Sequence, residues 1–334
     1  MSNKVKIAVD AMGGENSPKK VLDGIKISLK KNNDCFFYLY GNHEILSKHI
    51  NGDKSLLDNC EIIDAKGEIQ DNESPLKAAK RGKDTSMWKV IESQKENKSD
   101  ISLSAGNTGA LLVISRLVLN TIKGINKPAL AALWPNNKDM NVVLDLGANI
   151  ECDAKNLTDF ACMGAALSKS LFNKDTPKVA LLNVGLEEIK GNDVLKKTFQ
   201  ILKESKVKDF EFCGYIEGNQ MMDGDIDVII TDGFTGNIAL KTAEGTANFI
   251  AKNFKKSLSK LSVLLSYSSL NKFKEKLDPR KYNGAIFLGL ESAVVKSHGS
   301  TDAVGFAHSI DVCRKIVHAK LIEKIKSHLI TVDD

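Results

Sequence analysis

The sequence predicts a mostly parallel, three-layer α/β/α fold, in which helices cover both faces of one sheet. Short runs rich in β-branched residues alternate with longer segments of helical period along the chain. Several runs, among them Val142–Leu146 and Val179–Asn183, are apolar at successive positions, as expected for strands buried on both faces. Strands that alternate with helices in this way are typical of a parallel sheet.

The strands can be placed in chain order from these runs. Each is followed by a turn and, in most cases, by a helix. After the first strand, Ser17 and Pro18 are placed as the N-cap and first residue of a helix, and a later helix is expected to run through Leu119. The predicted strands are Val5–Val9, Phe36–Tyr40, Ile62–Asp64, Ile101–Ser104, Val142–Leu146, Val179–Asn183, Phe210–Cys213 and Val228–Thr231.

Length and composition indicate one globular catalytic unit over residues 1–334. The 334 residues can bury a sizeable core, and 42% apolar with 27% charged residues is ordinary for a folded protein. No internal repeat or Pro/Gly/Ser-rich linker divides the chain. No apolar run reaches the roughly 18 residues of a spanning helix, and the first residues predict a strand instead of a signal peptide. We therefore expect a cytoplasmic protein.

The cysteines and the basic residues exclude two further classes of function. Six cysteines lie far apart, without a C-x-x-C pair or a histidine at zinc-ligand spacing, so they are interpreted as reduced core residues and no metal is expected. The net charge is only +5, and just four of the 47 basic residues are arginines. Reading a nucleic-acid sequence relies on arginine forks. The composition therefore argues against a nucleic-acid partner and leaves acidic partners open.

Glycine-rich turns are the candidate site. Three follow predicted strands and a fourth precedes the C-terminal helix; they span residues 10–18, 105–110, 231–237 and 297–302. Ligands collect at the carboxyl ends of strands in such sheets. Small residues let backbone N–H groups approach an anion, and a helix start adds free donors and a positive dipole end. No turn has the G-x-x-x-x-G-K-[ST] or G-x-G-x-x-G pattern, so neither nucleotide nor other cofactor is expected.

One lysine joins these turns. Lys190 lies in the loop that follows Val179–Asn183, which is expected to place it at the same edge of the sheet as the glycine turns. Its ammonium group could hold a phosphate or stabilise a developing oxyanion. A solvated surface lysine is the alternative, and only the position at a strand end favours a functional role.

Six segments together carry a resemblance to a known family. They are IAVDAMGGENSP, LSAGNTGALL, LDLGAN, ALLNVGLEEIKGN, DVIITDGFTGNIALKTAEG and VVKSHGSTDAVGFA. In this order, from about Val5 to Phe306, the chain resembles the bacterial acyl-carrier-protein:phosphate acyltransferases of phospholipid synthesis, the PlsX family. The resemblance implies a fold similar to isocitrate and isopropylmalate dehydrogenases and to phosphotransacetylases. It also implies a homodimer that makes acyl-phosphate for a membrane glycerol-3-phosphate acyltransferase.

The resemblance also implies roles for individual residues. Lys190 and Asn237 would lie nearest the chemistry. The residues expected to bind substrate or phosphate are Asp10, Gly13, Gly14, Asn107, Thr108, Gly109, Asp232, Gly233, Thr235, Gly236, His298, Ser300 and Asp302. Two departures from the family pattern are Glu15, at the end of the first motif, and the stretch Lys80–Asp84, which puts in doubt a carrier-docking role for that stretch.

The implied reaction mainly requires that the protein position its two substrates. Inorganic phosphate is already an anionic nucleophile, so no Ser-His-Asp device is required, and the sequence has no G-x-S-x-G elbow. Phosphate must be held against the thioester carbonyl, with donors aimed at the oxyanion. Asn237 is a candidate donor. His298 is either an acid for the leaving thiolate or a residue that caps its turn.

A second feature predicts contact with a membrane. Residues 245–274 contain no acidic residue but six lysines, and an apolar stripe follows helical spacing there. Residues 240–280 are therefore predicted to form a helical excursion for dimerisation, with possible contact to anionic lipid. A buried dimer helix with a solvated lysine face is the alternative. The residues expected to touch the membrane are Leu258, Leu261, Leu264 and Leu265.

Three other functions share part of this evidence. A phosphotransacetylase that uses CoA would have the same fold and the same acyl-phosphate chemistry, so the accepted thiol carrier distinguishes it. A metal-dependent decarboxylating dehydrogenase would need an arginine-rich hydroxy-acid site, which four arginines make a poor match. A non-enzymatic membrane scaffold would leave the glycine turns without a purpose.

Overall fold

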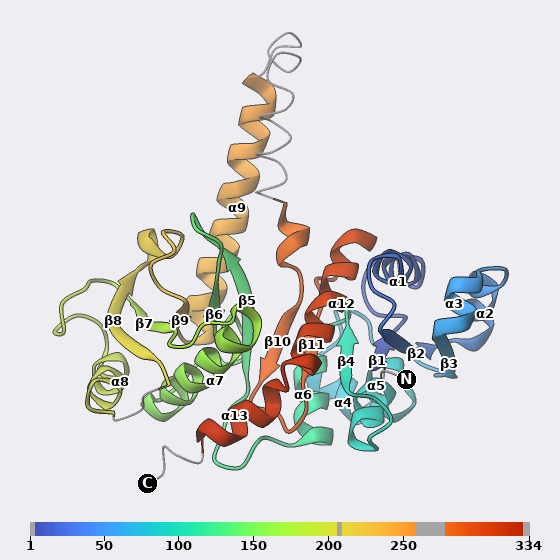
Figure 1. Cartoon of the computed structure of the whole chain (residues 1–334), viewed down its shortest axis with the longest axis horizontal. Helices are drawn as coiled ribbons and strands as arrows, with labels where there is room; N and C mark the ends of the chain where they lie inside the picture. The colour runs from blue at the N-terminus through green and yellow to red at the C-terminus, as the bar shows by residue number, and fades with distance from the viewer. Residues whose placement is uncertain (1–3, 206–208, 258–277, 330–334) are drawn as a thin grey trace.

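A computed structural model describes residues 4–205, 209–257 and 278–329. Within these ranges one sheet of eleven strands runs through the molecule in the order β3-β2-β1-β4-β11-β10-β5-β6-β9-β7-β8 (Figure 1). The strands are β1 (Val5–Asp10), β2 (Cys35–Gly41), β3 (Cys60–Asp64), β4 (Ile101–Ser104), β5 (Ala129–Pro135), β6 (Met140–Leu144), β7 (Lys178–Asn183), β8 (Glu211–Glu217), β9 (Val228–Ile230), β10 (Ala285–Leu288) and β11 (Val294–Lys296).

Helices cover both faces of this sheet. On one face α1 packs on α12, and α7 packs on both α8 and α13; on the other face α6 packs on α4 and α5. These helices are α1 (Lys19–Lys31), α4 (Pro75–Arg81), α5 (Ser86–Lys95), α6 (Thr108–Leu119), α7 (Ala154–Phe172), α8 (Asp193–Glu204), α12 (Ala303–His318) and α13 (Leu321–Leu329). The short helices α2 (His43–Ile50) and α3 (Lys54–Asn59) lie at the β3 end. The predicted three-layer, mostly parallel fold is confirmed.

The sheet consists of two parallel blocks that run in opposite senses. Strands β3, β2, β1, β4 and β11 are mutually parallel, as are β6, β9, β7 and β8. Between the blocks, β10 pairs antiparallel with both β11 and β5, and β5 pairs antiparallel with β6. The strand ends of the two blocks therefore lie at opposite edges of the sheet. The prediction that Lys190 shares an edge with all the glycine turns is wrong.

Most predicted strands are present, with shifted ends. The run Val142–Leu146 ends as a strand at Leu144, and Phe210–Cys213 becomes β8, which begins at Glu211 and continues to Glu217. Strands β5, β10 and β11 were not predicted. Strand β11 has only three residues and β10 four, too few for a period to show, whereas β5 is rich in alanine, which is depleted in strands.

Two local predictions differ from the structure. Helix α1 begins at Lys19, so Pro18 takes the N-cap position that was predicted for Ser17, and Ser17 lies one residue before it. The Ser17 hydroxyl donates a hydrogen bond to the Gly13 carbonyl at 2.6 Å, which tightens the first glycine turn. The six cysteines are free, but Cys213 is exposed and is not a core residue.

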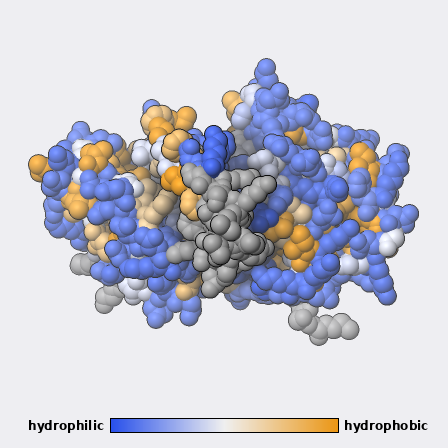
Figure 2. All heavy atoms as spheres, turned by 90° about the horizontal axis from the view of Figure 1, so that it is seen from above, coloured by the Kyte–Doolittle hydropathy of each residue, from blue (hydrophilic) through white to orange (hydrophobic). Residues whose placement is uncertain are grey.

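Helix α9 (Gly233–Ser257) leaves the body of the molecule and projects from it (Figure 1). Its first turns pack on the β6–β9 block through partly buried Ala239, Leu240 and Ala243. Farther along, Phe249 and Ile250 are exposed by 69% and 55%. From above, hydrophobic side chains form patches on a mostly hydrophilic surface (Figure 2). No helix in the described ranges is long and apolar enough to cross a membrane.

Candidate active site

The first half of the site lies where β1, β4 and β11 end. Asp10, the last residue of β1, is 1% exposed, and burial raises the pKa of its carboxyl group. Its oxygens accept hydrogen bonds from the hydroxyls of Ser86 and Ser104, both at 2.7 Å, and from the Met12 amide at 3.3 Å. Asp10 thus holds the turn in place, and its carboxylate oxygens accept hydrogen bonds from protein groups.

Glycine is required in the turn that Asp10 supports. Gly14 has φ +81°, which disfavours other residues. A Cβ atom there would lie 2.8 Å from the Ala105 carbonyl oxygen, 2.8 Å from the Lys20 ammonium nitrogen and 2.9 Å from the Gly299 carbonyl oxygen. A Cβ on Gly13 would meet the Asp10 carboxylate at 2.6 Å and the Gly106 amide nitrogen at 2.7 Å. The turns after β1, β4 and β11 therefore meet at one place.

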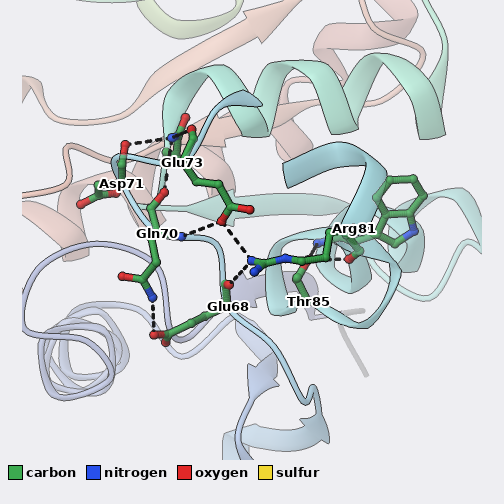
Figure 3. A network of polar contacts seen from close by, with 9 residues as sticks. Glu68, Gln70, Asp71, Glu73, Arg81 and Thr85 are labelled. Atoms are coloured by element: carbon green, nitrogen blue, oxygen red, sulfur yellow. Dashed lines mark hydrogen bonds and ion pairs between the residues drawn. The ribbon is translucent and has the colours of Figure 1, made fainter. Parts of the chain in front are cut away.

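Asn107 begins α6 and holds a neighbouring loop. Its side-chain oxygen accepts from the Ala110 amide at 3.0 Å and so caps the helix. Its amide nitrogen donates to the carbonyls of Asp71 and Glu73, both at 2.9 Å, while Arg81 forms a 3.0 Å ion pair with Glu73 (Figure 3). The polar atoms of Asn107 are thus occupied within the protein. Beside it, Thr108 is exposed and Gly109 packs on Pro75.

The loop after β11 carries the other predicted residues of this half. The Nδ1 atom of His298 lies 3.1 Å from the Ser300 hydroxyl, and the His298 amide donates to Asn283. Desolvation and the charge of Lys296 lower the pKa of His298. Asp302 caps α12 by accepting from the Gly305 amide at 2.9 Å and pairs with Arg280 at 3.1 Å, so both its oxygens serve the protein.

The second half of the site lies where β6 and β9 end. Asp232 accepts from the amide and hydroxyl of Thr235 at 2.7 and 3.0 Å and so holds the first turn of α9. The Gly233 amide donates to the Asn149 carbonyl at 2.7 Å. A Cβ on Gly236 would overlap the Asp145 carbonyl oxygen, so this position accepts only glycine. Asn237 is exposed and lies beside Gly147.

Asp145 is the counterpart of Asp10 in this half. It follows β6, is fully buried, and accepts hydrogen bonds from the amides of Leu130, Gly147, Ala148 and Asn149 and from the Asn149 side chain, at 2.7 to 3.3 Å. Burial raises the pKa of its carboxyl group. In both halves a buried aspartate stands at the end of one strand or directly after it, and the adjacent parallel strand leads into a G-x-T-G turn. These turns are residues 106–109 beside Asp10 and residues 233–236 beside Asp145.

A cavity of about 450 Å³ adjoins the second half. Loop 150–152, the start of α8 and the start of α9 form its walls, and Ile150, Leu157, Val194, Leu195 and Phe234 give it an apolar side. Asn192 and Thr235 add polar groups. Lys190 lies two residues before Asn192, is exposed, and makes no side-chain hydrogen bond or ion pair with the described residues. The structure thus brings the Lys190 loop and the α9 turn to one cavity.

Electrostatics link the two halves. Desolvation is the main cause that lowers the pKa of His298, but the charges of Lys241 and Glu244, two to three turns into α9, also act on it. This part of the helix therefore lies near the loop after β11. Asn237 precedes Lys241 by four residues, and residues with this spacing share a helix face. The predicted residues therefore form two groups. One group contains Asp10 to Gly14, Asn107 to Gly109 and His298 to Ser300, and the other contains Lys190 with Asp232 to Asn237.

Sequence reasoning missed three buried charged residues of these turns: Lys20, Asp145 and Lys296. Lys20 and Lys296 are 5% and 8% exposed. Asp145 and Lys296 stand inside segments that were quoted for their glycines, LDLGAN and VVKSHG. A lysine at the end of an apolar strand was the available signal for Lys296, because lysine is rarely buried without a reason. Nothing in the sequence near Lys20 indicates that its side chain is buried.

Comparison with known proteins gives a consistent result. Residues 5–324 match the family model described as fatty acid synthesis protein. The chain is 59% identical to a phosphate acyltransferase of Pelagibacter ubique, over 98% of this chain and 100% of that one, and 40% identical to one of Roseobacter denitrificans, over 98% and 94%. A phosphotransacetylase structure from Streptococcus pyogenes has a similar fold, with a TM-score of 0.64 at 16% identity over 97% and 95% of the chains.

Proposed function

Since the chain belongs to the fatty acid synthesis protein family and is closely similar to phosphate acyltransferases along its length, we propose that it transfers a fatty acyl group from acyl carrier protein to inorganic phosphate. The chain is an enzyme that forms acyl-phosphate, and the carrier is the proposed part. The observation that carries this conclusion is the 59% identity over nearly the whole chain. Phospholipid synthesis, through a membrane glycerol-3-phosphate acyltransferase, is the proposed use of the product.

The reaction transfers an acyl group from a thiol to a phosphate oxygen. A phosphate oxygen attacks the thioester carbonyl carbon, a C–O bond forms, and the C–S bond breaks as the tetrahedral oxyanion collapses. The thiol leaves as a thiolate, whose pKa near 8.5 makes it a good leaving group that then takes a proton from solvent. The protein must therefore hold two substrates in line and stabilise one oxyanion.

The two halves of the site suit these two tasks. In our proposal, the turns around Asp10 hold phosphate with backbone amides and helix starts, while Asn237 donates to the oxyanion and Lys190 adds positive charge. The apolar wall of the cavity beside α9 accommodates the first carbons of the acyl chain. Asp232 and Gly236 act by positioning Asn237, because they shape the helix turn that carries it.

His298 has a structural role in this proposal. The ordinary pKa of histidine is about 6.5, and both desolvation and Lys296 lower it here. The imidazole is therefore neutral at pH 7 and is a poor proton donor. Its Nδ1 atom lies 3.1 Å from the Ser300 hydroxyl, and in our proposal this contact stabilises the loop after β11.

The direct test is to incubate the purified chain with acyl-[acyl carrier protein] and phosphate, and to measure acyl-phosphate and free carrier. We expect both products in equal amounts, and an unchanged rate when EDTA is added, because the sequence offers no metal-ligand cluster. Acyl-CoA in place of the carrier is the control for a phosphotransacetylase-type activity. Preference for acyl-CoA would contradict the proposed donor, and loss of activity in EDTA that magnesium restores would contradict metal independence.

We also propose a cytoplasmic homodimer that attaches reversibly to anionic membranes, within a single catalytic unit from which residues 240–280 project. The exposed apolar residues of α9, such as Ile238 and Phe249, support a protein contact along this helix. The leucines predicted to touch the membrane, Leu258, Leu261, Leu264 and Leu265, lie outside the described residues.

Replacement of Leu261 and Leu265 by glutamate is expected to abolish binding to anionic vesicles, because it puts charge where an apolar face would enter lipid. Lysines near such a surface contribute about 1 kcal/mol each, which allows reversible attachment. Sedimentation with vesicles, run beside size-exclusion chromatography, measures both membrane binding and dimer formation. A variant dimer that still sediments with vesicles like the parent would refute the membrane contact, and loss of the dimer would place these leucines in the interface.

A further inference from the structure

Two buried lysines flank the first glycine turn. Lys20 lies in α1 and Lys296 ends β11, so they come from distant parts of the chain. The Lys20 ammonium donates to the Gly299 carbonyl at 2.7 Å, and the Lys296 ammonium donates to the carbonyls of Ala105, at 3.4 Å, and Ser297. Ala105 and Gly299 border the same point beside Gly14. Both cations therefore point to one small region.

Neither lysine has an acidic partner in direct contact. Within the described ranges, their hydrogen bonds go only to carbonyl groups, and neither forms an ion pair with a carboxylate. Of the acids whose charges act on these lysines, Glu15 and Asp71 are exposed, and buried Asp10 already accepts from Ser86 and Ser104. Removing an ammonium group from water is costly unless a counter-charge is present, and lysine is almost never fully buried without one. A bound anion would therefore stabilise the two buried ammonium groups.

The helix that carries Lys20 also favours an anion. Lys20 is the second residue of α1, and the first turn of this helix contains no acidic residue. The positive end of a helix dipole disfavours a cation and favours an anion. The hydrogen bonds that Asp145 accepts in the matching turn come from backbone amides and from the Asn149 side chain. Among the described residues, the buried lysines are Lys20 and Lys296, and both lie beside the turn around Asp10.

Building on the proposed acyl transfer to phosphate, we propose that Lys20 and Lys296 bind the acceptor substrate: they hold a doubly charged phosphate group between the start of α1 and the turns after β4 and β11. The ligand is inorganic phosphate. The phosphodiester on the pantetheine arm of the acyl carrier has similar chemistry, and the experiment below separates the two. Lys20 and Lys296 are binding residues that neutralise the phosphate charge, while Lys190 and Asn237 act at the carbonyl.

The charge of Lys296 makes the binding depend on pH. Burial lowers the pKa of Lys296 to about 8, with a further lowering by Lys20 that Asp71 and Asp10 oppose. Its ammonium therefore loses a proton between pH 7 and 9.5. Burial also lowers the pKa of Lys20, while Glu15, Asp71 and Asp10 raise it. Phosphate affinity is expected to fall as pH rises through about 8.

The test replaces each lysine by methionine, which keeps the length of the side chain and removes the charge. We expect Lys20→Met and Lys296→Met each to raise the KM for phosphate about tenfold to hundredfold, the usual effect of losing one charge-assisted contact. The KM for the acyl donor should change less than twofold. Lys19→Met is the matched control, because Lys19 is the exposed neighbour of Lys20, and it should leave both constants unchanged.

Binding is measured without turnover as well, by calorimetric titration of inorganic phosphate into the full chain at pH 7 and at pH 9.5. Affinity that depends on both lysines and falls at pH 9.5 supports the site even if no acyl-phosphate is made, so failure of the proposed reaction remains distinguishable. If either variant does not fold, the pH titration of the parent chain decides. Unchanged phosphate affinity in both folded variants, a parent affinity that is constant with pH, or an effect on the donor KM alone would each overturn the proposal.

Discussion

Replacing Asn237 by alanine is expected to lower turnover by about 10²-fold or more, the usual cost of removing an oxyanion donor. Asn237 is exposed at the start of α9, beside Gly147, on the helix face that leads to Lys241 and the His298 loop. Its side chain supports no other part of the fold in the described structure, so the stability of the protein should remain close to that of the parent. Lys190→Ala is expected to lower turnover to a similar degree.

Steady-state rates with acyl carrier protein thioester and phosphate check this expectation. Asn237→Asp keeps the size of the side chain but removes its donor, so it should be as slow as the alanine variant, whereas Lys190→Arg should recover part of the rate. Asn248→Ala, at an exposed position on the same helix, is the control and should be as fast as the parent. Rates near the parent value in both alanine variants would refute the assignment of the oxyanion site.

Asp145→Ala is expected to have the largest effect on stability, lowering the free energy of unfolding by about 3 to 5 kcal/mol. The carboxylate accepts five hydrogen bonds, at 2.7 to 3.3 Å, from Leu130, Gly147, Ala148 and Asn149. Each buried donor left without an acceptor costs about 1–3 kcal/mol, and relaxation or entry of water recovers part of the sum. Activity should fall too, because Gly147 lies against Asn237.

Urea unfolding followed by circular dichroism measures this change. Asp139→Ala is the control, because Asp139 is exposed in the β5–β6 hairpin, and a surface change there should stay within about 0.5 kcal/mol. Asp145→Asn keeps one acceptor oxygen and should lie between the alanine variant and the parent. A loss below about 1 kcal/mol for Asp145→Ala, with its backbone donors protected as in the parent, would contradict the role given to this carboxylate.

Local signals in the sequence were enough to predict the fold class. Runs such as Val179–Asn183 are apolar on both alternations because helices cover both faces of the sheet, and this pattern is visible in a few residues. Strand direction is different, since it depends on partners far along the chain. Strands β5, β10 and β11 together reverse the sense of the sheet. Strands β10 and β11 are too short to show a period and β5 is rich in alanine. The opposite directions of the two blocks therefore could not be predicted.

The glycines of the candidate turns could be predicted for the same reason. Glycines such as Gly14 and Gly236 can be recognised in the sequence, because a turn with no room for a side chain requires glycine. Burial of a charged residue depends on what surrounds it in space. In the sequence, Lys20 resembles any solvated lysine at a helix start. In the structure, the loop after β11 places the Gly299 carbonyl against its ammonium group. Asp302 was predicted to bind substrate, and the structure adds that its oxygens cap α12 and pair with Arg280.

The position of β11 in the sheet has a consequence for synthesis of the chain on the ribosome. Strand β4 ends at Ser104, but the strand that pairs with it on its inner side begins at Val294. Until that late segment emerges, the β3-β2-β1-β4 block keeps an open edge beside β4, and such edges invite pairing with other chains. A nascent chain stopped before residue 294 would therefore hold two unjoined sheet halves, exposed to aggregation and dependent on chaperones. It would also lack Lys296, so the proposed phosphate site would be incomplete until that late segment is translated.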